Sequence, residues 1–292
     1  MVKNPPFSYD EPMKLLPVVA GSFYPETRKG LLEFFEEFER GKKAALPSGQ
    51  TVGMLLPHAG YPYSGALAAL GYRSLEGPVE TVVVAGPSHY VSFRGVSLFA
   101  GQSVVTPLGE IPVDQEACRF LMDFDSRIAE IMPAFSREHS AEVHFPLIQR
   151  YLPSAKIVPI VMGQGKEQAI RPLAEGLLAL WKKKPFLFVA SSDLSHYPLY
   201  DTAVSADHQF LEAVLSGDER QVEKVDQEIM GRGYPDYYCT HCGREPVAVL
   251  LKFAKGVGAD KIKLLDARNS GDVTGDHHRV VGYGAVVFVK SN

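Results

Sequence analysis

The chain has few cysteines, no long apolar run and no excess of positive charge. Its three cysteines, Cys118, Cys239 and Cys242, are too few for a disulfide framework, which predicts a reduced, cytoplasmic protein. No stretch reaches the roughly 18 apolar residues of a membrane span, and the N-terminus lacks the apolar core of a signal peptide. Basic residues number 30 against 34 acidic ones, so no nucleic-acid partner is expected.

Three common catalytic motifs are also missing. The sequence contains no Walker-A pattern, no GxGxxG after a predicted strand and no GxSxG nucleophile elbow. These absences argue against nucleotide-driven chemistry and against an α/β-hydrolase.

Apolar runs of strand length alternate with segments of helical period, which predicts an α/β fold. We expect a single layered domain over residues 1–292, with a central mixed, mostly parallel sheet flanked by helices and residues 1–16 as an N-terminal arm. Strands are expected at 52–56, 81–85, 157–161, 186–190, 263–267 and 280–289, with a β-hairpin over 95–113. Helices are expected at 27–40, 64–75, 114–124, 141–151, 166–183, 203–216, 220–229 and 244–255.

Polar, metal-capable residues follow three of these strands. His58 comes after 52–56, His89 after 81–85, and the pair Asp193 and His196 after 186–190. In open α/β sheets, ligands bind at the carboxyl ends of the strands, so these residues are predicted to share one pocket. Neutral imidazole binds most first-row metals. The alternative is that each histidine only caps or hydrogen-bonds its loop.

Cys242 adds a soft ligand just before the helix predicted from residue 244. Unpaired N–H groups and the helix dipole at that position favour a thiolate, and Arg244 adds positive charge. Cys239 and Cys242 also have CxxC spacing, so a redox pair or half of a zinc site is an alternative. The sequence contains no second CxxC to complete such a site.

Asp193 and His196 predict an acid–base pair, because a neighbouring carboxylate orients a histidine and raises its basicity. The alternative is a turn in which Asp193 caps backbone N–H groups. The segment 138–144 is not an HExxH motif. Ser140 is expected to cap the helix over 141–151, His139 to face the pocket from the helix entrance, and His144 to pack in the interior.

Six motifs taken together resemble the Memo family, whose microbial members include the B component of the AmmeMemoRadiSam system. They are Pro57-His58-Ala59-Gly60-Tyr61, Gly86-Pro87-Ser88-His89, Glu138-His139-Ser140-x-Glu142, Ser191-Ser192-Asp193-Leu194-Ser195-His196, Cys242-Gly243-Arg244 and Ser270-Gly271-Asp272-Val273-Thr274-Gly275-Asp276. The match runs from about residue 17 to the C-terminus. The family is related in structure to the class III extradiol dioxygenases, which implies a fold similar to theirs.

The resemblance implies that His58, His89 and Cys242 are metal ligands, with the cysteine replacing the dioxygenase glutamate. It places His196, with Asp193, where the dioxygenases keep their general base. Residues expected to line the same pocket are Tyr61, Ser88, His139, Glu142 and Arg244. The expected metal is Fe(II), with copper or zinc as alternatives. The family usually has Gln at position 144, so the resemblance implies no function for the histidine there.

The resemblance favours a metal-dependent oxidoreductase of unknown substrate. Ring cleavage is not expected, because a thiolate is softer than a carboxylate and is itself oxidisable. One alternative is a non-catalytic module that binds a peptide or phosphopeptide through Tyr61, Tyr90 and Arg244. Another is a hydrolase with Cys242 as nucleophile. Expected partners are a small molecule or peptide in the cleft and proteins of the AmmeMemoRadiSam system.

Overall fold

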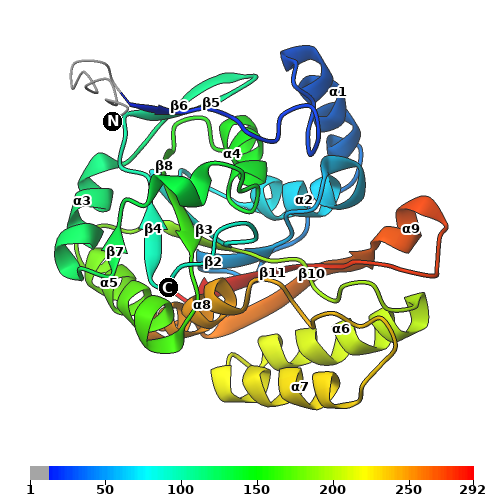
Figure 1. The fold of residues 1–292 in the computed structure, drawn as a ribbon. Helices are drawn as coiled ribbons and strands as arrows, with labels where there is room; N and C mark the ends of the chain where they lie inside the picture. Colours follow the sequence, from blue (N-terminus) through cyan, green and yellow to red (C-terminus); the bar gives the residue numbers. More distant parts are fainter. Residues whose placement is uncertain (1–12) are drawn as a thin grey trace, which may run out of the picture.

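The computed structural model describes residues 13–292, and its centre is an eight-stranded sheet (Figure 1). The strands lie in the order β10-β11-β2-β9-β3-β8-β4-β7. Four neighbours at the centre run parallel: β2 (Gln50–Leu56), β9 (Leu187–Ser191), β3 (Thr81–Pro87) and β8 (Lys156–Met162). Antiparallel pairs join β10 (Lys261–Asn269) to β11 (Gly282–Lys290), β11 to β2, and β8 to β4 (Val96–Leu98), and β7 (Ile128–Ala129) runs parallel to β4. This confirms the predicted mixed, mostly parallel sheet.

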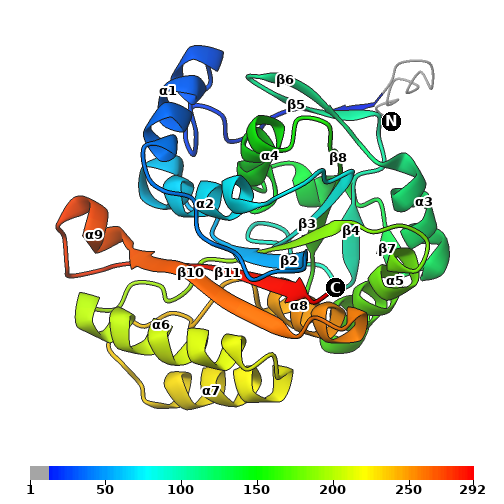
Figure 2. The ribbon, with the colours of Figure 1, turned by 180° about the vertical axis from the view of Figure 1, so that it is seen from behind.

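Helices cover both faces of the sheet, as predicted (Figure 2). On β2, Gly53 faces Leu250 of α8 (Arg244–Val257), whereas Leu56 faces Gly71 of α2 (Ala66–Ser74). Residues 53 and 56 point to opposite sides of a strand, so α8 and α2 pack on opposite faces. The other α-helices that the structure describes are α1 (Arg28–Glu39), α3 (Gln115–Phe124), α4 (Phe145–Tyr151), α5 (Arg171–Trp181), α6 (Tyr200–Leu215), α7 (Glu219–Gly231) and α9 (Ser270–Thr274).

No helix within residues 13–292 has both the length and the apolar character of a membrane span. A second, three-stranded sheet contains β1 (Lys14–Leu15), β5 (Ser103–Thr106) and β6 (Gly109–Pro112). The hairpin predicted over 95–113 is therefore only β5 and β6, because β4 joins the main sheet. Residues 1–12 of the predicted N-terminal arm lie outside the described part of the chain, and residues 14–15 pair with β5.

The prediction for Ser140 was wrong. A short 3-10 turn (Glu142–His144) precedes α4, and no side chain caps it. The Ser140 hydroxyl instead donates a 2.7 Å hydrogen bond to the Pro87 carbonyl at the end of β3. The segment around His139 is therefore tied to the same sheet edge as His89.

The order of the central strands explains why distant motifs meet. Strands β2, β9 and β3 are parallel neighbours, so their carboxyl ends lie at one edge of the sheet. His58, Asp193 and His89 each stand two residues beyond the end of one of these strands. The sheet therefore places all three residues at the same edge.

Candidate metal centre

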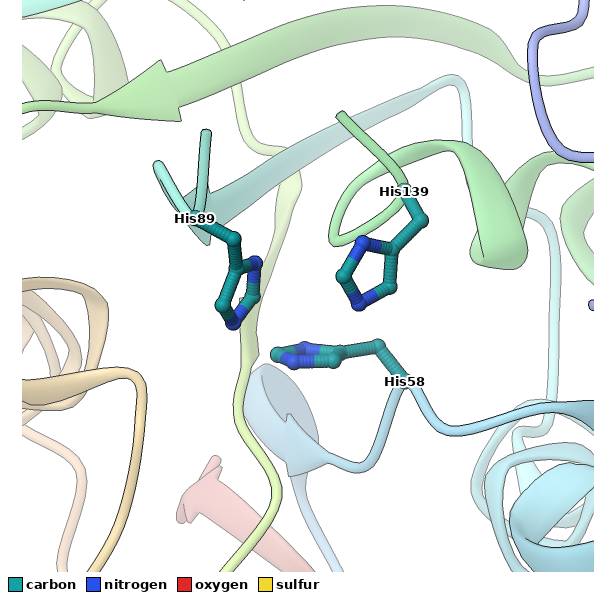
Figure 3. A group of neighbouring side chains, drawn as sticks. All are labelled: His58, His89 and His139. Atoms are coloured by element: carbon teal, nitrogen blue, oxygen red, sulfur yellow. The ribbon is translucent and has the colours of Figure 1, made fainter. Parts of the chain in front are cut away.

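Three histidines from three separate loops converge at this edge (Figure 3). His58, His89 and His139 each offer one ring nitrogen, and these nitrogens lie within 4.8 Å of one another. The rings of His89 and His139 stack, with centroids 4.6 Å apart and planes 24° apart. The His58 ring meets both nearly edge-on, with centroid distances of 5.2 and 5.3 Å.

Glu138 fixes the orientation of His89. Its buried carboxylate accepts hydrogen bonds from the His89 backbone N–H at 2.6 Å and from His89 Nδ1 at 2.9 Å. Burial raises the pKa of Glu138, but the interactions with His89 and the N–H bond from Ser140 together hold it below its ordinary value. With Nδ1–H bound to a carboxylate, His89 keeps Nε2 as its free lone pair, as metal-binding histidines do. This role of Glu138 was not predicted from the sequence, although its place beside His139 was a signal.

His58 is held from both its backbone and its ring. Its N–H and that of Ala59 donate to Asp193 Oδ1 at 2.8 and 3.2 Å. Its Nδ1 lies 2.7 Å from the Ser191 hydroxyl. Burial, and then the nearby histidines, lower the pKa of His58 well below its ordinary value, so the ring is neutral. A neutral imidazole is the form that binds metal.

His139 joins the cluster with an unsatisfied nitrogen. Its buried Nδ1 has no hydrogen-bond partner among residues 13–292, because Glu138 Oε1, although 3.4 Å away, lacks hydrogen-bond geometry. The ring packs on Phe23 at a centroid distance of 4.3 Å. Burial lowers the pKa of His139 to about 4, so this histidine is also neutral near pH 7.

The Cys242 sulfur lies 3.2 Å from His58 Nε2, at the free edge of the ring. Cys242 stands two residues before α8, as predicted. The predicted thiolate was wrong for the metal-free protein, because burial and the charge of Asp193 raise the pKa of Cys242 well above its ordinary value. The Arg244 guanidinium pairs with Asp226 at 2.7 Å, and Arg244 is not among the groups that lower the pKa of Cys242.

Asp193 and His196 lie in the same turn but have different partners. Asp193 accepts the backbone bonds of His58 and Ala59, and its Oδ2 is 4.0 Å from His58 Nε2. The carbonyl of Leu194, not Asp193, accepts from His196 Nδ1, at 2.8 Å. The Nε2 atom of His196 is therefore free, as it is in His89. Burial raises the pKa of the Asp193 carboxyl.

The remaining predicted pocket residues have structural partners. Tyr61 is 1% exposed, packs against Tyr24 and the phenylalanines of α1, and donates to the Val143 carbonyl at 3.1 Å. The Ser88 hydroxyl closes its own turn by donating to Val91 at 2.7 Å. The Glu142 carboxylate accepts from the N–H groups of Val18 and Val19 and from Tyr24. The Tyr61 hydroxyl and the Glu142 carboxylate are therefore engaged in structural hydrogen bonds.

Comparison with known sequences agrees with the motif-based resemblance. A family model described as "Memo-like protein" matches residues 16–287. The chain belongs to the Memo family. Among curated Memo-family relatives, a MEMO1 family protein of Pyrobaculum aerophilum is 33% identical over 284 residues, covering 94% of this chain and 98% of its own length. Another, from Methanobrevibacter smithii, is 35% identical over 285 residues, covering 93% and 98%.

A solved structure, titled as an uncharacterized protein of Escherichia coli K12, is a more distant match to this Memo-family chain. It has a TM-score of 0.49 and 12% identity, and the match covers 82% of this chain and 100% of that one. A likeness at this level says nothing about the activity of the Memo-family chain.

The donor set of this Memo-family protein fits a single transition-metal ion. Metal–nitrogen bonds of about 2.0–2.1 Å place two nitrogens of one ion no more than about 4.2 Å apart. The ring nitrogens of the cluster, within 4.8 Å of one another, lie close to that range. His58 and His89 have hydrogen-bonded Nδ1 atoms, and His139 has a buried nitrogen with no partner. The arrangement can hold a metal on imidazole ligands, with Cys242 beside it.

Proposed function

We propose that this protein binds one Fe(II) ion through His58 and His89 and acts as a non-haem, metal-dependent oxidoreductase in the cytoplasm. The observation that carries the proposal is the convergence of three histidines whose ring nitrogens lie within 4.8 Å of one another. An iron ion held by few protein ligands keeps coordination positions open for substrate and oxygen. Such an ion would supply redox chemistry at the site. The free cysteines support a reducing compartment.

The third ligand is Cys242 in this proposal. Its sulfur is 3.2 Å from His58 Nε2, a separation compatible with two ligands of one ion, since metal–sulfur bonds are about 2.3 Å long. A bound cation reverses the effect of burial on the pKa and deprotonates a coordinating thiol. His139 is the competing third ligand, because its nitrogen belongs to the cluster.

Copper and zinc are the alternative metals, since imidazole and thiolate suit both. Substitution with Co(II) shows whether Cys242 or His139 is the third ligand. A sulfur-to-cobalt charge-transfer band that disappears in Cys242→Ser and remains in His139→Ala supports Cys242. Absence of that band in the cobalt-loaded wild type, with cobalt binding weakened in His139→Ala and unchanged in Cys242→Ser, assigns His139.

His196 supplies acid–base function in the proposed reaction. Its Nδ1 is fixed on the Leu194 carbonyl, so Nε2 can accept or return a substrate proton. Asp193 holds the backbone of His58 and contributes negative charge near the cluster. Asp193 is therefore a positioning residue for His58, and only His196 is proposed to exchange protons with the substrate.

Metal analysis of anaerobically purified protein tests the proposal. We expect close to one iron per chain in the wild-type protein and none in the double variant His58→Ala with Cys242→Ser. Stoichiometric metal in that variant would show that the site is assigned wrongly. Oxygen uptake by the iron-loaded protein with candidate reductants then tests for turnover.

A binding module is the second candidate function. Tyr90 is 48% exposed beside the cluster, and the Arg137 guanidinium lies 5.2 Å from its ring. This pair suits an anionic aromatic group on a small molecule or peptide. Metal-free protein that binds a phosphotyrosine peptide with micromolar affinity would favour this function, and partners from the AmmeMemoRadiSam system would be tested in the same assay. The raised pKa of Cys242 argues against the hydrolase alternative.

A further inference from the structure

We propose that a buried relay of Tyr72, His144 and Ser191 fixes the tautomer of His58, so that its bare Nε2 faces the metal position. In this proposal His144, expected from the sequence only to pack, is a positioning residue. The tautomer follows from the hydrogen bonds alone. The consequence for metal affinity rests on the proposed function.

The Ser191 hydroxyl, at the end of β9, has three partners. It donates to the Ser140 carbonyl at 2.6 Å, and it lies 2.7 Å from His58 Nδ1 and 2.9 Å from His144 Nε2. A hydroxyl has one proton and two acceptor lone pairs, and a carbonyl can only accept. The proton therefore goes to Ser140, and both histidine nitrogens must donate.

Counting donors and acceptors in the same way gives the direction of the hydrogen bond between His144 and Tyr72. His144 donates from Nε2, so its other nitrogen, Nδ1, is an acceptor when the ring is neutral. Burial lowers the pKa of His144 to about 3, which keeps the ring neutral. The Tyr72 hydroxyl lies 3.0 Å from that Nδ1 and donates to it. Every polar atom of the relay then has a partner of the correct sense.

Burial makes this orientation obligatory. His144 and Ser191 are 0% exposed, and Tyr72 and His58 are 1% exposed, so solvent cannot replace a lost bond. The other tautomer of His58 would point a lone pair at the Ser191 oxygen, whose proton already serves Ser140. A buried acceptor left without a donor in this way is unfavourable. The Nδ1–H tautomer is therefore strongly preferred before any metal arrives.

The free Nε2 of His58 points to the cluster. The Cys242 sulfur lies 3.2 Å from this nitrogen, on the side away from Ser191. His89 reaches the same state by a different device, its bond to Glu138. Both proposed ligands therefore carry their proton on Nδ1. The Glu138 carboxylate holds it there in His89, and the neutral relay holds it there in His58.

Nitrogen-15 NMR of the metal-free protein tests the tautomer directly. We expect His58 to show a protonated Nδ1 and a bare Nε2, and Ser191→Ala to shift part of the population to the other tautomer. A wild-type His58 protonated on Nε2, or a Ser191→Ala spectrum with unchanged His58 signals, would overturn the relay. Correct tautomers in a protein that binds no metal would leave the relay intact and reject the proposed function.

Zn(II) affinity, measured by chelator competition, tests the consequence. His144→Gln is the conservative variant, because its amide has one donor for Ser191 and one acceptor for Tyr72. We expect it to bind within about threefold of wild type, whereas His144→Leu should lose about 10- to 100-fold, as outer-shell changes typically do. Equal affinity for the Gln and Leu variants would contradict the proposal. If the Leu variant does not fold, Tyr72→Phe replaces it, with an expected loss of at least threefold; unchanged affinity there would also contradict the relay.

Discussion

At the scale of single residues, the site depends on which nitrogen of each histidine is already occupied. His58 and His89 both have Nδ1 bound by the protein, to Ser191 and Glu138. Each ring therefore has its lone pair on Nε2, and neither has to change tautomer before a metal binds. His139 is less restrained, since no residue in the described part of the chain bonds to its Nδ1. This difference makes His58 and His89 the core of the proposed metal site.

Glu138→Gln should lower metal affinity about 10- to 100-fold, because the amide replaces a charge-assisted bond to His89 with a weaker one. Isothermal titration with Zn(II) measures the change. Glu142→Gln is the matched control, since that buried carboxylate binds Val18, Val19 and Tyr24 and no metal-site histidine. Equal losses in the two variants would mean that Glu138 acts only through stability.

At the scale of elements, the loop that carries Cys242 packs closely against the end of β9. A Cβ on Gly243 would lie 2.6 Å from the Ser191 carbonyl oxygen and 2.6 Å from Ser192 Cβ. Real side-chain carbons do not approach a backbone that closely, so the loop can sit here only with glycine at this position. The close approach brings Cys242 within reach of His58.

Gly243→Ala should destabilise the protein by about 1–3 kcal/mol, the usual effect of overpacking, and should weaken metal binding. The control is Gly231→Ala near the end of α7, where nothing lies within 4 Å of the new Cβ. There alanine should stabilise by about 0.5–1 kcal/mol. Urea denaturation measures both changes, and a Gly243→Ala variant as stable as wild type would refute the close packing described.

At the scale of the whole molecule, the sequence predicted the sheet well because buried parallel strands are continuous apolar runs. Thr81–Pro87, buried at every position, is the clearest example. The strand-end rule then predicted that His58, His89 and Asp193 would gather at one edge. It could not predict that Leu194 rather than Asp193 would bind His196, or that Tyr61 would enter the core. Those outcomes depend on side-chain direction in turns, which periodicity does not encode.

Asp207 on α6 should make stability depend on pH. It is 6% exposed, accepts from the Ser195 N–H at 3.0 Å, and burial raises its pKa to about 7. Between the unfolded pKa near 4 and this value, the unfolded chain is ionised while the native protein keeps the proton. Stability contributed by the neutral carboxyl is therefore complete below about pH 4 and is lost as pH rises to about 7, by roughly 4 kcal/mol at most.

Asp207→Asn removes this titration. The free energy of unfolding, measured in urea at a series of pH values, should fall less steeply between pH 4 and 7 in the variant than in the wild type. Parallel profiles for the two proteins would show that Asp207 ionises in the native state as it does in the unfolded chain.

Anaerobic titration of Fe(II) into wild-type protein, His89→Ala and His208→Ala tests the metal site most directly. His208 is an exposed histidine of α6, away from the cluster, and serves as the matched control. We predict one equivalent of iron bound by the wild type and by His208→Ala, and an affinity at least 100-fold lower in His89→Ala. Iron binding of equal stoichiometry and affinity in His89→Ala would show that His89 is not a metal ligand.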